Sequence, residues 1–164
     1  MKAEIAEAKR LMESSLEVVQ KLSECFGRDI YHNGRLNRGL LSSRVFGESD
    51  KIVLLNSIVH PVVRFDFYRW SESLNEEICF VESAILYESR FDELVDEVWT
   101  VTAPEELRIG RVRQRSGLTE EEIKKRMAAQ LSEEEKQRRA AHIIWNDGNV
   151  SVIHRVLSLL KSLE

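Results

Sequence analysis

The sequence of 164 residues is long enough for one domain with a substantial core and too short for two independent ones. It is 43% hydrophobic and 32% charged, with seven glycines and two prolines, which excludes collagen-like, low-complexity and disordered proteins. No apolar run approaches the roughly 18 residues that span a bilayer. Charged residues are spread along residues 1–20, which excludes the apolar stretch of a secretory signal. We therefore expect a soluble, cytoplasmic protein without a secretory signal or a membrane partner, in which Cys25 and Cys79 are core thiols.

The net charge of −4 is unevenly distributed. Residues 105–139 hold seven Arg and three Lys against eight Glu, a local balance of +2, which leaves −6 for the rest of the chain. An arginine-rich segment on an acidic protein suits a small anionic ligand better than a nucleic acid polymer. A solvated helix face with ion pairs between successive turns would have the same composition.

The first half of the chain has the apolar periodicity of helices. Gly27 should end the first helix, and His60-Pro61 should break or restart the helical pattern and leave the backbone of His60 extended. Asn33-Gly34 lies in a turn-rich stretch over residues 28–38. The expected helices are 3–25, 38–45, 50–58 and 62–74.

The second half alternates short apolar runs with helical segments, which predicts an α/β fold with a parallel sheet. The expected strands are 78–81, 97–101 and 142–145, and the expected helical segments are 90–95, 105–115, 119–130, 132–140 and 150–163. Capping boxes begin at Thr119 and Ser132, and Gly117 should end the helix before them. Polar residues at the carboxyl ends of the strands mark the expected ligand edge, although turns also need such residues.

The chain contains five blocks, residues 26–38, 55–61, 81–88, 111–130 and 143–148, which in this order resemble the dephospho-coenzyme A kinase family. The fourth block contains Arg111 to Arg115 and Ser116-Gly117-Leu118-Thr119, and the last contains Trp145-Asn146-Asp147-Gly148. Each block is weak by itself, but the five together extend over nearly the whole chain from about Ala8.

The sequence departs from the family pattern at the residues that handle phosphate. The family's phosphate-binding loop, Gly-x-x-x-x-Gly-Lys-Ser/Thr, is matched only in glycine spacing by Gly34 and Gly39, which Leu40-Leu41 follow. The family's Asp-x-Asp, with its catalytic base, aligns with Ala3 and Ile5, neither of which accepts a proton.

The resemblance implies a P-loop kinase-like three-layer α/β/α fold with a parallel sheet from which the central strand is missing. It also implies one kinase-like domain over residues 1–164, with a helical coenzyme-binding lobe at 26–75 and a lid-like helical segment at 105–140. We expect the three remaining strands to form a small parallel sheet. Its exposed edge could support self-association.

The resemblance also assigns the binding of ATP and Mg2+. Arg111 and Arg115, one helical turn apart, would be catalytic lid arginines that neutralise the transferring phosphoryl group. Glu82 would hold the metal through water. The other residues expected to contact ATP are Asn146, Gly148, Arg113 and Arg139.

Dephospho-coenzyme A would bind through residues of the helical lobe and the block after the first strand. These residues are Arg38, His60, Arg64 and Glu88. A histidine in a helical lobe is also a common packed residue, and an Asn-Asp-Gly turn needs no ligand.

Two functions from different classes follow. The first is ATP-dependent phosphorylation of the 3′-hydroxyl of dephospho-coenzyme A, the last step of coenzyme A synthesis, with little turnover expected because the phosphate loop and the base are not found. The alternative is a non-catalytic, truncated α/β fragment that acts as a binding or association module.

Overall fold

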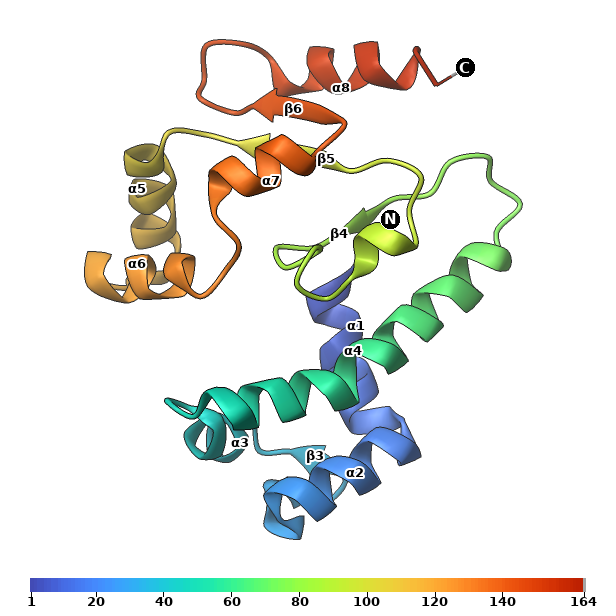
Figure 1. Cartoon of the computed structure of the whole chain (residues 1–164), viewed down its shortest axis with the longest axis vertical. Coiled ribbons are helices and arrows are strands. Elements are labelled where there is room, and N and C mark those ends of the chain that lie inside the picture. Colours follow the sequence, from blue (N-terminus) through green and yellow to red (C-terminus); the bar gives the residue numbers. More distant parts are fainter. Residues whose placement is uncertain (164) are drawn as a thin grey trace. The chain divides into compact units, whose positions relative to one another are not determined.

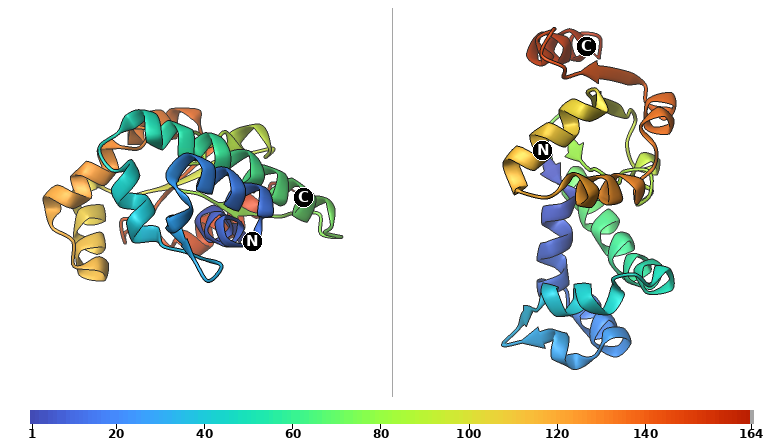
Figure 2. Two further views of the ribbon diagram at one scale, coloured as in Figure 1. Left: turned by 90° about the horizontal axis from the view of Figure 1, so that it is seen from below. Right: turned by 90° about the vertical axis from the view of Figure 1, so that its left-hand side faces the viewer.

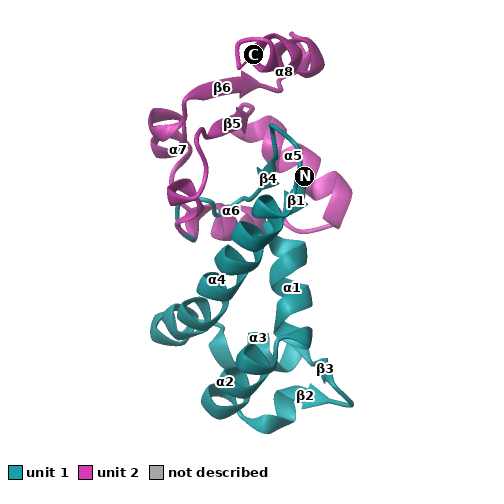
Figure 3. Cartoon of the chain, turned by 90° about the vertical axis from the view of Figure 1, so that its right-hand side faces the viewer, with its two compact units in different colours: residues 1–89 teal, residues 90–164 magenta. Residues whose placement is uncertain are grey.

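The computed structural model describes residues 1–163. The chain divides into two compact units, residues 1–89 and residues 90–164 (Figure 3). Unit 1 is mainly helical, whereas unit 2 combines a strand pair with short helices (Figure 1). The fold is therefore mixed α/β, as the sequence predicts.

Unit 1 is built on helices that share one apolar core. Its elements up to residue 72 are α1 (Glu4–Ser14), α2 (Leu16–Phe26), η1 (Arg28–Ile30), β2 (Tyr31–His32), β3 (Arg35–Leu36), α3 (Arg38–Val45) and α4 (Ser49–Glu72). Helices α1 and α2 both pack against α4 (Figure 2). The core side chains of unit 1 are Leu11, Val18, Leu22, Phe26, Ile30, Leu36, Leu41, Ile58, Val59, Val63 and Phe67.

The helix expected over residues 3–25 is two helices, divided at Ser15. The backbone of Ser15 is extended, and its hydroxyl accepts a hydrogen bond from the amide of Val18, so that it caps α2. A Ser side chain can satisfy the first amides of a new helix, which apolar periodicity does not reveal. Gly27 ends α2 at a φ of 93°, as predicted.

The turn-rich stretch after α2 contains a small antiparallel hairpin. Strands β2 and β3 pair with Tyr31 opposite Leu36 and His32 opposite Arg35. Asn33 and Gly34 connect them with φ of 49° and 76°. Positive φ at both positions is what a two-residue hairpin loop requires, and Asn-Gly is the pair that adopts it most readily.

The expected break at His60-Pro61 is wrong, because α4 runs without interruption from Ser49 to Glu72. Pro61 removes one backbone donor inside the helix. Buried side chains before and after it, among them Val59 and Val63, hold both halves on the same core. His60 therefore has helical rather than extended backbone.

Polar contacts fasten the start of the chain to α4. Lys2 Nζ lies 2.9 Å from Asp66 Oδ2 and 5.3 Å from the centre of the Trp70 ring. Arg10 of α1 donates to the other oxygen of Asp66 at 2.8 Å. These contacts place β1 (Lys2–Ala3) beside α4 within unit 1.

Strand β1, which the sequence analysis did not predict, pairs in parallel with β4 (Val81–Glu82). The register sets Lys2 opposite Val81 and Ala3 opposite Glu82. The strand expected at 78–81 is thus displaced toward the C-terminus, and Ile78 and Phe80 are exposed. The pairing is limited to two residues because α1 begins immediately at Glu4.

Unit 2 is organised around β5 (Trp99–Thr102) and β6 (His142–Trp145), which pair in parallel with Trp99 opposite His142. The other elements are η2 (Phe91–Glu93), α5 (Glu105–Ser116), α6 (Glu120–Ala128), α7 (Glu133–Arg139) and α8 (Val152–Leu160). The helix expected at 90–95 is only the short turn η2. In residues 1–163, β4 pairs with β1 and not with β5, so the single three-stranded sheet that we predicted is wrong.

The helix ends of unit 2 follow local sequence closely. Thr119 and Glu122 form the predicted reciprocal capping box, and Gly117 ends α5 at a φ of 69°. At Ser132 only one half of the predicted box forms: its hydroxyl caps α7, but the carboxylate of Glu135 pairs with Arg138 instead.

The structure also bears on the expectations for the two cysteines and for membrane-spanning helices. Cys25 and Cys79 are exposed thiols, so the expectation that they are core residues is wrong. Within residues 1–163, no helix combines the length and apolar character needed to cross a membrane.

Candidate active site

The predicted ligand residues fall into groups, each of which lies within one unit. In unit 1 an acidic segment follows β4, with Glu82 at the strand end and Glu88 in the turns that come next. Both side chains are exposed. Ser83 Oγ accepts from the amide of Ile85 at 3.0 Å, and the Ser89 hydroxyl donates to the carbonyl of Ile85 at 2.8 Å. These bonds give the segment 82–89 a defined path.

Beneath this segment lies a carboxyl group that sequence reasoning missed. Glu4, the first residue of α1, is 4% exposed and its Oε2 has no hydrogen-bond partner among the described residues. Burial raises the pKa of Glu4; the hydroxyls of Ser83 and Ser89 act against this rise, and the charge of Glu88 adds to it. A glutamate in the first turn of a helix is common on surfaces, so the sequence offered no sign of its burial.

In unit 2 the carboxyl ends of β5 and β6 lie together, as parallel pairing requires. The amide of Asn146 donates to the carbonyl of Thr102 at 2.7 Å, which extends the pairing by one residue. Arg111 of α5 donates from Nη1 to the carbonyl of Asn146 at 2.8 Å. The structure therefore brings together Arg111 and the Asn146–Gly148 turn, two features that the sequence selected separately.

Asp147 completes the turn after β6. The backbone amide of Asn149 donates to Asp147 Oδ1 at 3.0 Å and is the main cause that lowers the pKa of this carboxyl, to which the guanidinium of Arg111 contributes. Asp147 is therefore ionised at neutral pH, and Gly148 follows it at a φ of 92°. The turn over residues 146–149 thus places backbone groups and Asn side-chain amides next to Arg111, which is held by the carbonyl of Asn146.

The remaining arginines of the lid-like segment are arranged differently. Arg113 and Arg115 are exposed on α5. Arg139, at the end of α7, donates to Asp92 Oδ2 at 2.7 Å, which ties α7 to η2. The structure thus gives Arg139 a contact with Asp92, a role that the sequence did not predict.

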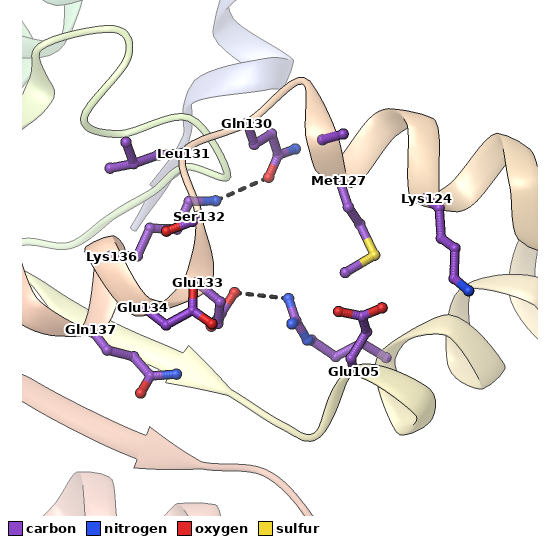
Figure 4. Close-up of a pocket in the computed structure, with 12 residues that line it drawn as sticks. Glu105, Lys124, Met127, Gln130, Leu131, Ser132, Glu133, Glu134, Lys136 and Gln137 are labelled. Atoms are coloured by element: carbon purple, nitrogen blue, oxygen red, sulfur yellow. Dashed lines mark hydrogen bonds and ion pairs between the residues drawn. The ribbon is translucent and has the colours of Figure 1, made fainter.

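A hollow of about 680 Å³ lies among α5, α6 and α7 (Figure 4). Arg108 lines it and donates to Glu133 Oε2 at 2.7 Å, while Lys136 Nζ lies 3.0 Å from Gln130 Oε1. Arg108 Nε is buried without a hydrogen-bond partner among residues 1–163. Because acidic and basic side chains line the hollow in mixture, its wall favours no single charge.

Two of the predicted coenzyme-binding residues lie one turn apart on α4, namely His60 and Arg64. Both are half-buried. Arg38 begins α3 and lies 3.1 Å from Glu13 of α1. His60 and Arg64 are thus brought together by the helix, and Arg38 is held by a contact of its own.

The ionisation of His60 leads to a testable pH dependence. Burial, with the charge of Arg64 in addition, lowers the pKa of His60 from the ordinary 6.5. The unfolded chain therefore binds this proton first as pH falls, so the free energy of unfolding should fall below about pH 6.5 and through the lower folded pKa. The midpoint of thermal unfolding between pH 7.5 and 5 measures it.

Two variants separate this effect from other titrations. His60→Gln should reduce the loss of stability on acidification, because glutamine does not titrate. Arg64→Gln should reduce it partly, because one of the two causes is removed. An identical pH dependence in the wild type and His60→Gln would contradict the assignment.

The comparisons with known proteins bear on the family and the fold of the chain. The family model described as dephospho-CoA kinase matches residues 4–151. The chain belongs to the dephospho-CoA kinase family. Members of the family are phosphotransferases of coenzyme A synthesis that use ATP.

Dephospho-CoA kinases from several bacteria align with nearly the whole of this chain and with about three quarters of their own length. The dephospho-CoA kinase of Bacteroides fragilis is 35% identical over 158 residues, 96% of this chain and 77% of the relative. That of Salinibacter ruber is 39% identical over 153 residues, 91% of this chain and 77% of the relative.

Solved structures confirm the predicted fold class. The crystal structure of TT1252 from Thermus thermophilus has a TM-score of 0.84 and 31% identity, and the match covers 98% of this chain and 82% of that one. Dephospho-CoA kinase from Campylobacter jejuni has a TM-score of 0.69 over 99% of this chain and 86% of that one, and at 23% identity it supports the fold alone.

Proposed function

We propose that this chain supplies the coenzyme-binding and lid parts of a dephospho-CoA kinase, which transfers the γ-phosphoryl group of ATP to the 3′-hydroxyl of dephospho-coenzyme A. The observation that carries the proposal is the contact between Arg111 and the carbonyl of Asn146. It joins a cationic helix to the turn at the carboxyl ends of a parallel strand pair, which is where α/β proteins bind nucleotides.

In unit 2, ATP would be held by residues with separate tasks. The side-chain amide of Asn146 can offer a donor and an acceptor to adenine. Gly148, which has no side chain, lets the backbone approach the base. Arg111 and Arg115 would neutralise charge on the phosphates, with Arg113 in support. Arg139 would act only after it leaves Asp92, since the two form an ion pair.

Unit 1 would hold dephospho-coenzyme A and the metal ion. Glu82 offers one exposed carboxylate at the end of β4, and Mg2+ is commonly held by one or two carboxylates together with water and substrate phosphates. This donor fits Mg2+ in that mode, and residues 1–163 contain no cluster of three metal-binding side chains for a closed site. Bound Mg2+ would offset phosphate charge. Arg38, Arg64 and Glu88 would contact the coenzyme.

His60 would act as a neutral hydrogen-bonding group rather than as a cation. Its lowered pKa keeps the ring uncharged at neutral pH, and Arg64, one turn further along α4, carries the positive charge. A neutral His60 beside a cationic Arg64 suits a ligand with a phosphate next to a neutral polar group.

Phosphoryl transfer needs a phosphate-binding loop as well as these residues. The 164 residues contain no Gly-x-x-x-x-Gly-Lys-Ser/Thr, and Ala3 and Ile5 stand where the family has carboxylates. We therefore propose that these residues by themselves bind dephospho-coenzyme A but transfer phosphoryl groups slowly or not at all.

The experiment compares two forms of the protein. One is the 164-residue chain, and the other is the same chain with Ala3→Asp and Ile5→Asp, joined at its N-terminus to a phosphate-loop segment that follows the family pattern. Isothermal titration should show dephospho-coenzyme A binding to both, and a coupled ATP assay should show turnover only in the joined form. Equal turnover in the two forms would contradict the proposal.

The alternative, a non-catalytic association module, is favoured by one observation. Val101 and Trp145, on the paired strands β5 and β6, are 56% and 48% exposed. Such apolar side chains on strands favour association with another surface. Absence of binding of ATP and of dephospho-coenzyme A, together with a dimer in sedimentation, would support this alternative.

A further inference from the structure

Glu4 occupies an unusual position in unit 1. It follows β1 directly, begins α1, and lies one residue beyond Ala3, which pairs with Glu82 of β4. The carboxyl end of the β1–β4 pair therefore carries Glu4 on one strand and the acidic segment 82–89 on the other.

Burial of the Glu4 side chain costs desolvation free energy that an apolar side chain at the same position would not. An apolar residue could fill the same space, whereas a carboxyl group loses its hydration and leaves Oε2 without a hydrogen-bond partner among the described residues. Buried polar groups that are incompletely satisfied are rare and often belong to functional parts of a protein.

The neighbours of Glu4 show what it can hold. Ser83 and Ser89, at the two ends of the segment, are the hydroxyl groups that interact with its carboxyl. Ser89 is itself 2% exposed, and it donates to the carbonyl of Ile85, whose amide donates to Ser83. One buried carboxyl group thus lies beside both ends of a hydrogen-bonded turn.

The surroundings of Glu4 oppose the ionised form of its carboxyl group. Glu88, in the same segment, opposes ionisation of Glu4, and burial opposes it more strongly. The hydroxyls of Ser83 and Ser89 interact with this carboxyl group, which can act as both donor and acceptor when it holds a proton.

We infer that Glu4 is a positioning residue, which fixes the path of segment 82–89 through Ser83 and Ser89 and so places Glu82 and Glu88 at the ligand edge. The consequence for ligands rests on the proposed function, whereas the fixing of the segment does not. Glu4 itself does not touch substrate, because its side chain is buried.

The test uses three variants of the full chain. Glu4→Ala removes the polar group, and Glu4→Gln keeps its shape and one donor and one acceptor. Glu17→Gln alters an exposed glutamate of α2 and is the matched control. Amide hydrogen exchange is measured by NMR at Ile85 and Ser89, whose amides have partners within the segment, and at α2 and α4.

In Glu4→Ala we expect exchange at Ile85 and Ser89 to be at least ten times faster, with α2 and α4 within twofold of the wild type. Glu4→Gln should restore protection to within about threefold, and the control should not change. Unchanged exchange at Ile85 and Ser89, or equal acceleration in all helices, would overturn the inference. So would a Gln variant as unprotected as the Ala variant.

Titration with dephospho-coenzyme A gives the second measurement. The Kd should rise at least fivefold in Glu4→Ala and less than twofold in Glu4→Gln. If the Ala variant loses protection but keeps the wild-type Kd, Glu4 does not position the ligand edge and the inference fails. If the wild type binds no dephospho-coenzyme A, the proposed function fails, and hydrogen exchange still decides the role of Glu4 in the segment.

Discussion

Leu22→Ala should lower the free energy of unfolding of unit 1 by about 2–5 kcal/mol, the range for buried leucines replaced by alanine. Leu22 is completely buried in α2, which packs against α1, α4 and η1. Loss of its side chain removes apolar contacts and leaves a cavity among elements that support the expected coenzyme-binding lobe. Urea unfolding followed by circular dichroism measures the change.

The same helix provides the control. Leu16, the first residue of α2, is 87% exposed, so Leu16→Ala should change the free energy of unfolding by less than about 0.5 kcal/mol. Equal effects of the two substitutions would show that α2 does not pack as described.

Arg111→Ala should weaken ATP binding about tenfold or more in the joined, phosphate-loop-containing form of the protein. The variant loses a positive charge near the phosphates and the charged hydrogen bond to the carbonyl of Asn146. A charged hydrogen bond from the guanidinium to an ATP phosphate would contribute about 1.5–3 kcal/mol, and the lower end, about tenfold in affinity, applies because Arg111 is exposed. Fluorescence titration with a labelled ATP analogue measures affinity.

Arg115→Ala is the matched comparison, one helical turn further along α5. It removes the same charge without a bond to the Asn146–Gly148 turn, so its effect on affinity should be smaller, about threefold or less. Arg111→Lys should recover part of the loss, because lysine keeps the charge but not the planar fork. If Arg115→Ala weakened binding more than Arg111→Ala, the anchoring role of Arg111 would be wrong.

Local chemistry made part of the structure predictable. The limits of β6, the capping box at Thr119, the end of α5 at Gly117 and the hairpin turn at Asn33-Gly34 depend on residues within a few positions. Hydrogen bonds and backbone preferences at such positions act over short chain distances, and the sequence displays them directly.

Some features of the candidate site were harder to predict because they depend on partners elsewhere in the chain. Periodicity treated residues 3–25 as one helix and Pro61 as a break, since it does not weigh the Ser15 cap or the core beneath α4. The pairing of Arg139 with Asp92 likewise joins segments with many residues between them.

The sequence by itself determined the family, the α/β class and which residue types gather at the strand ends, because motifs and apolar patterns are properties of neighbouring residues. Only the tertiary structure decided that Glu4 is buried beneath Ser83 and Ser89, and that Arg111 reaches the carbonyl of Asn146. Burial and hydrogen bonding of a side chain depend on the segments that folding brings around it, which pattern alone does not contain.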